Sequence, residues 1–305
     1  MRLDSNKTLF KELIEKASNH FDINEEYIEK DYWQTLLLSR LFKNDLGYVF
    51  KGGTSLSKCY HLINRFSEDI DISYIEPYSE LGVSKINKKF KGITSSISEV
   101  GLQLINKDKL RRSAYFNQFL CEYESMFPNS LIEKHVTVEF AGQTPSFPTN
   151  KLIIQSFIGE YVEQKGMFKY LELYDLQKFE ITVQSLERTF IDKTFAICDY
   201  FLSGKAKKHS RHLYDLTKII NQIKLNDSLA LIFKEVRDLR KNIPVCVSAI
   251  GDNKLYENME SIINYDAFKS DYESLTYQLL YEKVPYNTCK ETLSIIKDFL
   301  KKYNL

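Results

Sequence analysis

Two aspartates, Asp69 and Asp71, carry the clearest chemical signal in the chain. They lie in a segment, residues 69–75, whose polar and apolar residues alternate. The alternation predicts a strand with both carboxylates on one face. Two carboxylates this close repel each other, and a bound cation relieves the repulsion. Hard carboxylate oxygens suit Mg²⁺ or Mn²⁺. The alternative is that these carboxylates lie on a solvated outer face of the strand.

A glycine-rich turn precedes this strand. Residues 48–50 are predicted to form a short apolar strand that leads into Gly52 and Gly53, followed by a helix over about 54–63. Glycines let the backbone approach an anion, and Thr54 can cap the helix or donate to a phosphate oxygen. An ordinary strand-to-helix turn has the same composition. Combined with paired carboxylates, however, the turn predicts metal-assisted phosphoryl or nucleotidyl transfer.

A lysine interrupts an apolar stripe in the second half of the chain. In the helix predicted over residues 186–203, spacings of three and four place Lys193 in this stripe. The apolar members of the stripe are Leu186, Phe190, Ile197 and Phe201. The ammonium of Lys193 therefore either reaches the edge of the helix or points into a site that needs a cation.

Two further acids have more than one interpretation. Glu139 alternates with Val136 and Val138 on a predicted strand and is expected to face away from them. It is either a third acid of the site or a solvated strand residue. Asp215 lies four residues after Arg211, so an ion pair across one helical turn would explain both.

The longer strings around these residues resemble a known family. The string KGGTSLSKCYHLINRFSEDIDISY, residues 51–74, resembles the signature of the DNA polymerase β-type nucleotidyltransferase superfamily, and within it the AbiEii/AbiGii toxin family. Three other strings fit the same family, so the resemblance covers most of the chain. They are IEKDYW at residues 28–33, LERTFIDK at residues 186–193 and RHLYDL at residues 211–216.

The resemblance implies roles for individual residues. Asp69 and Asp71 would bind the metal ions, with Glu139 as the third acid of the metal site. Lys193 would face the nucleotide phosphates, and Asp215 would belong to the catalytic site. The residues implied in nucleotide binding are Lys51, Gly52, Gly53, Thr54, Ser55, Lys58 and Lys193.

The implied activity is a metal-dependent nucleotidyltransferase that binds an NTP and transfers NMP to an RNA acceptor, such as tRNA, or to a protein. The resemblance also implies a toxin of a toxin–antitoxin or phage-defence pair, restrained by a partner antitoxin. A nucleotide-binding module without transfer activity and a metal-dependent nuclease are alternatives. A Ser-His-Asp hydrolase is disfavoured, because neither Ser57 nor Ser67 has an adjacent base.

These motifs require a scaffold of mixed type. Strands are predicted at 48–50, 69–75, 114–123, 134–141 and 151–157, and early helices at 5–18, 24–43 and 84–100. After residue 184 helical periods dominate, at 186–203, 209–224, 226–240, 266–281 and 288–302. We therefore expect an α+β fold. Residues 1–185 would form a nucleotidyltransferase lobe with a mixed sheet flanked by helices. Residues 186–305 would form a helical-bundle lobe that contributes nucleotide and acceptor contacts.

Composition narrows the class of protein further. The 305 residues carry 42 basic and 41 acidic side chains, which excludes a wholly electrostatic nucleic-acid binder. A local basic loop at residues 205–211 is either solvated or a contact for a nucleic-acid acceptor. The five cysteines are odd in number and lack CxxC spacing, which favours a reducing compartment. With neither a signal peptide nor a membrane-spanning run, we expect a cytoplasmic protein that makes no membrane contact.

Overall fold

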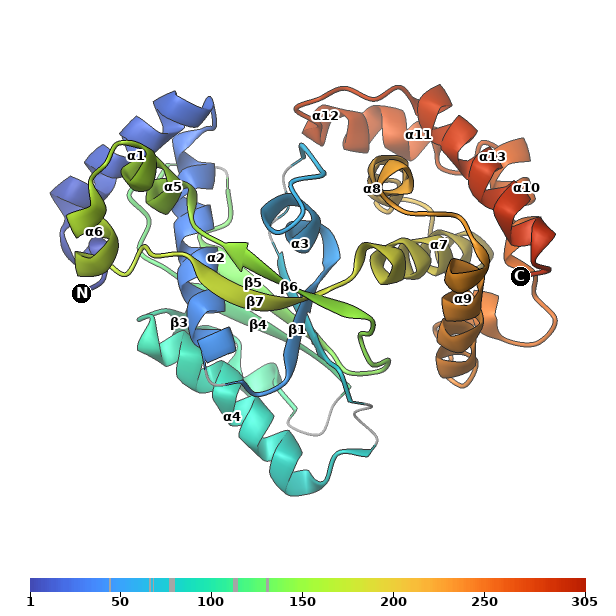
Figure 1. The fold of residues 1–305 in the computed structure, drawn as a ribbon, viewed down its shortest axis with the longest axis horizontal. Helices are drawn as coiled ribbons and strands as arrows, with labels where there is room; N and C mark the ends of the chain where they lie inside the picture. Colours follow the sequence, from blue (N-terminus) through green and yellow to red (C-terminus); the bar gives the residue numbers. More distant parts are fainter. Residues whose placement is uncertain (44, 66, 68, 77–79, 112–114, 130–131) are drawn as a thin grey trace. The chain divides into compact units, whose positions relative to one another are not determined.

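A computed structural model describes residues 1–43, 45–65, 67, 69–76, 80–111, 115–129 and 132–305. The α+β fold class is confirmed (Figure 1). The strands of a seven-stranded mixed sheet are interspersed with helices along the chain, and only helices follow the last strand. Phe66 and Glu68, which belong to the 51–74 string, lie outside the described residues.

The sheet has the strand order β3-β4-β5-β2-β1-β7-β6. Its strands are β1 (Tyr48–Lys51), β2 (Asp69–Tyr74), β3 (Gln103–Leu104), β4 (Phe116–Glu122), β5 (His135–Ala141), β6 (Thr149–Ile154) and β7 (Phe179–Gln184). At its centre β2 runs antiparallel to β1 and parallel to β5. The strand predicted over 151–157 is wrong at its end, because Ser156 caps a helix there by accepting a hydrogen bond from the backbone N–H of Gly159.

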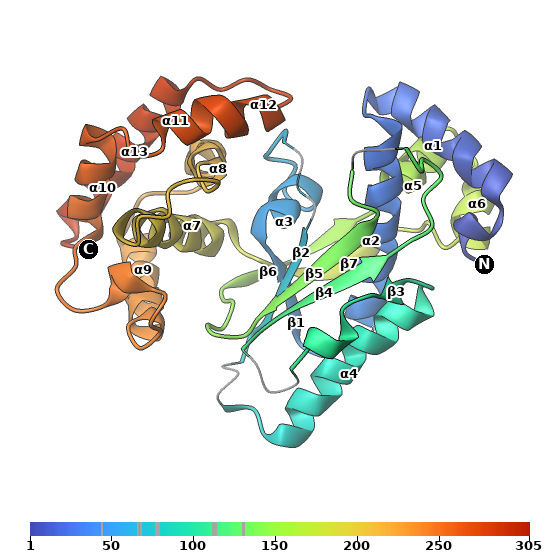
Figure 2. The same ribbon diagram turned by 180° about the vertical axis from the view of Figure 1, so that it is seen from behind.

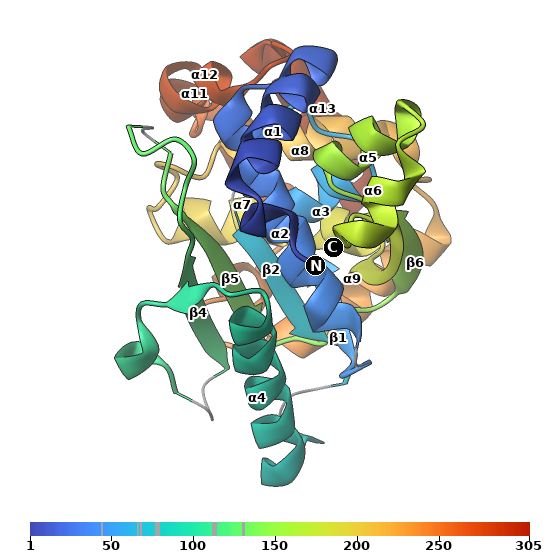
Figure 3. The ribbon, with the colours of Figure 1, turned by 90° about the vertical axis from the view of Figure 1, so that its left-hand side faces the viewer.

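One compact unit comprises residues 1–54, 68–145 and 149–183. Besides the sheet it holds the helices α1 (Lys7–Phe21), α2 (Glu25–Lys43), α4 (Val83–Glu99), α5 (Phe157–Gln164) and α6 (Phe168–Leu173). Helices α2 and α4 pack on one face of the sheet (Figures 1 and 3). Phe42 of α2 meets Tyr48 with ring centroids 6.3 Å apart, and Phe90 of α4 meets Phe119 at 5.6 Å. Alternate residues of β1, β2, β4 and β5 therefore point to the opposite face.

The second compact unit comprises residues 55–67, 146–148 and 184–305. Its helices are α7 (Leu186–Leu202), α8 (Arg211–Ile219), α9 (Asp227–Arg240), α10 (Leu255–Asn264), α11 (Lys269–Asp271), α12 (Tyr277–Leu279) and α13 (Tyr286–Lys302) (Figure 2). Helix α3 (Gly52–Lys58) joins the two units along the chain. Helix α7 packs against α8 and α10 around buried Phe190, Phe195 and Phe233.

Two helices of this unit differ from prediction. The helix expected over 266–281 is interrupted by a π-helical turn, Tyr272–Thr276. Asp271 and Thr276 at its ends are both engaged elsewhere, since Asp271 accepts hydrogen bonds from the backbone N–H groups of Lys208 and Ser210, and Thr276 shares one with the Ser210 hydroxyl. Helix α10 was not predicted. Among the described residues no helix is long and apolar enough to cross a membrane.

Candidate active site

The turn after β1 brings the backbone of Gly52 directly against Asp71. Lys51 and Asp71 are opposite one another in the antiparallel β1–β2 pair. Gly52 has φ +77°, and a Cβ atom at this position would lie 1.8 Å from Asp71 Oδ2. Only glycine accommodates both the left-handed backbone and this contact. The glycine-rich turn thus fixes where one carboxylate of the predicted metal pair can lie.

Asp69 and Asp71 share one face of β2, as predicted. Both are half-buried, whereas Ile70 and Ile72 between and after them are fully buried on the face covered by helices. In the parallel β2–β5 pair Asp71 is in register with Glu139. Because residues in register point to the same face, Glu139 joins the two aspartates on the face opposite α2 and α4.

A fourth polar side chain of this face was missed by the sequence analysis. Gln118 of β4 is paired with Glu139, and its Nε2 donates to Glu139 Oε1 at 2.9 Å. Within the described part of the chain, no three His, Cys, Asp or Glu side chains form a group able to hold a metal ion. Gln118 donates to only one of the two oxygens of Glu139, so the other oxygen could serve as a third ligand. The carboxylates fit Mg²⁺ or Mn²⁺, because they offer hard oxygen donors and lie on the same face of the sheet.

The remaining residues of the turn are more enclosed than expected. Helix α3 begins at Gly52, so Thr54 lies inside its first turn and is not the N-cap. Thr54 and Ser55 are 3% and 0% exposed, whereas Lys51 and Lys58 are half-buried. Gly53 is buried as well.

The second unit holds a buried cluster of three charged groups. Arg65 forms a bidentate ion pair with Asp215, through hydrogen bonds from Nε to Oδ1 at 2.8 Å and from Nη2 to Oδ2 at 2.8 Å. Lys193 Nζ donates to the same Oδ2 at 2.7 Å. Exposure is 6% for Arg65, 7% for Lys193 and 0% for Asp215. The buried carboxylate thus pairs with Arg65 and Lys193, whereas sequence spacing had suggested Arg211 as its partner.

Burial and the charges of the cluster shift the pKa values of its members. Burial alone would raise the pKa of Asp215, but Arg65 and Lys193 outweigh burial and hold that pKa well below its usual range. Burial lowers the pKa of Lys193, although Asp215 opposes this shift. Burial, together with Lys193, also lowers the pKa of nearby His212 well below its usual value, so this imidazole is neutral at pH 7.

Residues of three of the predicted motif strings meet in this cluster. Arg65 comes from the 51–74 string, Lys193 ends LERTFIDK, and Asp215 lies in RHLYDL. Neither composition nor periodicity singles out Arg65, because its contact with Asp215 joins residues 150 positions apart. Tyr214, next to Asp215, is 0% exposed, and its hydroxyl accepts a hydrogen bond from Asn64 N at 3.0 Å.

The basic loop 205–211 is held in a defined shape. Asp271 binds the backbone N–H groups of Lys208 and Ser210, as described above, and the ring of His209 stacks on Tyr200 with centroids 3.6 Å apart. Its four basic side chains are exposed: Lys205, Lys207, Lys208 and Arg211. The loop therefore presents a fixed group of cations at the surface of the second unit.

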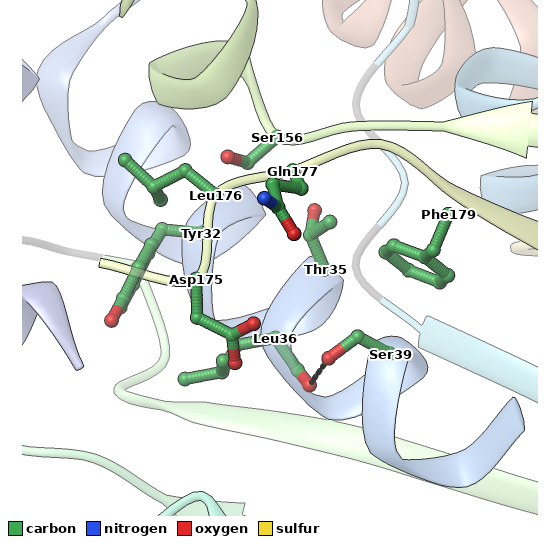
Figure 4. Close-up of a pocket in the computed structure, with 9 residues that line it drawn as sticks. All are labelled: Tyr32, Thr35, Leu36, Ser39, Ser156, Asp175, Leu176, Gln177 and Phe179. Atoms are coloured by element: carbon green, nitrogen blue, oxygen red, sulfur yellow. Dashed lines mark hydrogen bonds between the residues drawn. The ribbon is translucent and has the colours of Figure 1, made fainter. Parts of the chain in front are cut away.

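The IEKDYW string has a structural part in the first unit. Glu29 accepts hydrogen bonds from Met126 N at 2.7 Å and Ser125 Oγ at 2.6 Å, and Asp31 accepts one from Phe157 N at 2.9 Å. A small cavity next to Ser156, between α2 and residues 175–179, has room for about one water molecule (Figure 4). The string therefore ties α2 to the rest of its unit.

Comparison with known proteins adds independent findings. A family model described as "Nucleotidyl transferase AbiEii toxin, Type IV TA system" matches residues 36–286, well over half of the chain. Among solved structures, MenT4, a nucleotidyltransferase toxin from Mycobacterium tuberculosis H37Rv, superposes with a TM-score of 0.55 at 19% identity, over 93% of this chain and 88% of that one. A putative nucleotidyltransferase from H. pylori gives a TM-score of 0.48 at 16% identity, over 92% and 96% of the two chains. No curated protein matches.

Proposed function

The chain belongs to the AbiEii nucleotidyl transferase toxin family, and we propose that it transfers NMP from an NTP to an RNA acceptor in a reaction that depends on a divalent metal ion. Nucleotidyltransferase activity of the toxin class follows from the family itself. The finer assignment rests on one observation: Asp69, Asp71 and Glu139 share a sheet face, with Asp71 packed against the Gly52 turn.

In this proposal the three carboxylates hold the metal. Asp69 and Asp71 would supply two ligands and Glu139 the third, while Gln118 would orient Glu139 through its hydrogen bond to Oε1. A metal bound there would neutralise triphosphate charge and favour deprotonation of the attacking hydroxyl. The residues of the turn, with Lys51 and Gly53 foremost, would bind the nucleotide through the backbone and one ammonium group. Thr54, Ser55 and Lys58 support this segment.

Lys193 and Asp215 are proposed as the contribution of the helical lobe, residues 186–305. The Lys193 ammonium would contact a nucleotide phosphate and stabilise the negative charge that develops during transfer. Asp215 would hold that ammonium in place, a role supported by their 2.7 Å hydrogen bond. An ammonium group already fixed by a carboxylate loses less freedom on meeting a phosphate than a solvated one would.

An RNA acceptor is favoured over a protein by the basic loop 205–211. Four exposed cations on a loop clamped by Asp271 provide the phosphate contacts that RNA binding needs. The family description also implies a cognate antitoxin that restrains the toxin, and we propose phage defence as the setting in which the pair acts.

Transfer to RNA can be tested by incubating the protein with each α-labelled NTP, Mg²⁺ and total cellular RNA or protein. We expect labelled RNA that is longer than the input RNA. Shortened RNA without label would identify a nuclease, whereas NTP binding without any labelled product would identify a silent nucleotide-binding module. Label on protein alone would exclude the RNA acceptor.

A further inference from the structure

We propose that Arg65 is a positioning residue for Lys193: by occupying the Asp215 carboxylate, it leaves the Lys193 ammonium held in place with N–H donors available for an anionic ligand. The inference rests on the proposed function, since the anion is taken to be the triphosphate of the NTP. All three residues lie in the second unit, so their geometry is internal to it.

Arg65 makes more hydrogen bonds to the Asp215 carboxylate than Lys193 does. Arg65 reaches both oxygens of Asp215, as a planar guanidinium can, whereas Lys193 shares only Oδ2. Among the described residues the Lys193 ammonium donates to Asp215 alone. An ammonium has three N–H donors, so two remain for a ligand.

The Lys193 ammonium is buried and has few acceptors. Lys193 is 7% exposed, and in the part of the chain that the structure describes its one acceptor is Asp215 Oδ2, which it shares with Arg65. His212 beside it is neutral, and Arg211, on the same helix as Asp215, adds positive potential at Lys193. A buried ammonium with unused N–H donors is costly, so this one points to an anion that it binds.

The backbone that carries Arg65 is fixed independently of the ion pair. Asn64 N donates to the Tyr214 hydroxyl at 3.0 Å, and Asn64 O accepts from Tyr281 N at 2.9 Å. Arg65 itself forms an isolated antiparallel bridge with Leu280. The guanidinium is thus held in position before any ligand arrives, which reduces the entropy lost when the site is used.

The test compares Arg65→Met with Arg240→Met by calorimetric titration with an NTP and Mg²⁺ over a pH series, and by thermal unfolding. Arg240 is the matched control, because it is a largely buried arginine of the same unit that pairs with Asp199 at 2.8 Å and Asp192 at 3.5 Å. Both variants lose a buried cation and are expected to unfold at lower temperature. Only Arg65→Met is expected to bind NTP more weakly, by about tenfold or more.

The pH series separates positioning from mere support of the fold. NTP binding should weaken as pH rises through the pKa of Lys193, whose charged neighbours are Asp215, Arg65 and Arg211, with neutral His212 close by. Removing the positive charge of Arg65 raises that pKa, so the alkaline decline in affinity should move to higher pH in Arg65→Met. The control Arg240→Met keeps the charged neighbours of Lys193, so its alkaline decline should stay where it is in the parent even though the protein is less stable.

Lys193→Met separates the proposed phosphate contact of Lys193 from the positioning role of Arg65. If Lys193→Met binds NTP as tightly as the parent, the proposed phosphate contact of Lys193 is wrong. If Lys193→Met binds weakly but Arg65→Met keeps the parent affinity and alkaline decline, the phosphate contact stands and the role given to Arg65 is overturned.

A conservative variant, Arg65→Lys, covers the case in which Arg65→Met does not fold. It keeps a positive charge beside Asp215 but replaces the planar group that reaches both carboxylate oxygens by a single ammonium. We expect its NTP affinity to fall by about tenfold, because Asp215 and Lys193 are then held less firmly. An NTP affinity equal to that of the parent would overturn the inference.

Discussion

Gly52→Ala is the sharpest probe of how the turn positions the carboxylates. A Cβ atom at Gly52 would lie 1.8 Å from Asp71 Oδ2 and 2.6 Å from its Cγ, and the backbone there has φ +77°. The new methyl group cannot move, because it is attached to the backbone of the helix start. The Asp71 side chain must therefore withdraw.

The distances set the size of the effect. Going from 1.8 Å to the 3.4 Å of ordinary contact requires a withdrawal of about 1.6 Å. Misplacing a catalytic group by about 1 Å can cost roughly a hundredfold in rate. The left-handed backbone adds about 1–2 kcal/mol of destabilisation, because alanine has a Cβ atom. We therefore expect transfer to fall by about a hundredfold or more while the protein remains folded.

Gly166→Ala is the control for backbone strain. Gly166, in the same unit, has φ +69°, and a Cβ atom there would meet nothing within 4 Å. Both variants should lose a similar amount of stability in urea unfolding, but only Gly52→Ala should lose transfer of α-labelled nucleotide. If Gly52→Ala transfers label as fast as Gly166→Ala, the position of Asp71 does not control the reaction and the site assignment is wrong.

Four further changes follow from the same contacts. Asp71→Ala should abolish transfer without lowering the thermal midpoint, because it relieves like-charge repulsion; a fully active variant would remove Asp71 from the metal site. Lys193→Met should lower transfer at least about tenfold while unfolding changes little, since Arg65 still pairs with the carboxylate. Asp215→Asn should cost about 3–5 kcal/mol in urea unfolding, because two buried cations lose their counter-charge. Its depressed pKa keeps the Asp215 contribution intact at neutral pH, so the stabilities of parent and variant should converge only in strong acid. Asp31→Ala should cost about 1 kcal/mol through the lost bond to Phe157 N and leave transfer unchanged; slowed transfer would contradict a purely structural role.

The local patterns predicted the carboxylate face well. Alternation of period two in β2 places Asp69 and Asp71 together in any sheet, whatever surrounds it. The same reasoning put Glu139 on the opposite side of β5 from Val136 and Val138, which are both fully buried. Which of the two glycines takes the left-handed φ could not be inferred, because both occur in the same turn and either could adopt it.

Long-range contacts account for what the sequence did not predict. No local sequence pattern indicates the role of Gln118, because only the β4–β5 register places it beside Glu139. The helix expected to reach residue 63 ends at Lys58, and His61 takes a left-handed φ of 51°. Farther along the chain, Arg65 forms a bridge with Leu280. Helical periodicity cannot show that a distant segment competes for these residues.

The most direct test of the account is transfer of α-labelled NMP to total RNA by the parent protein and by Asp71→Asn, each with Mg²⁺ and with chelator. Asn is close to Asp in shape, so the fold and the contact with Gly52 should be kept while one metal-binding charge is lost. We expect the parent to label RNA only when Mg²⁺ is present and Asp71→Asn to label none. Equal labelling by both proteins, or labelling by the parent in chelator, would contradict metal-dependent transfer at the carboxylate face.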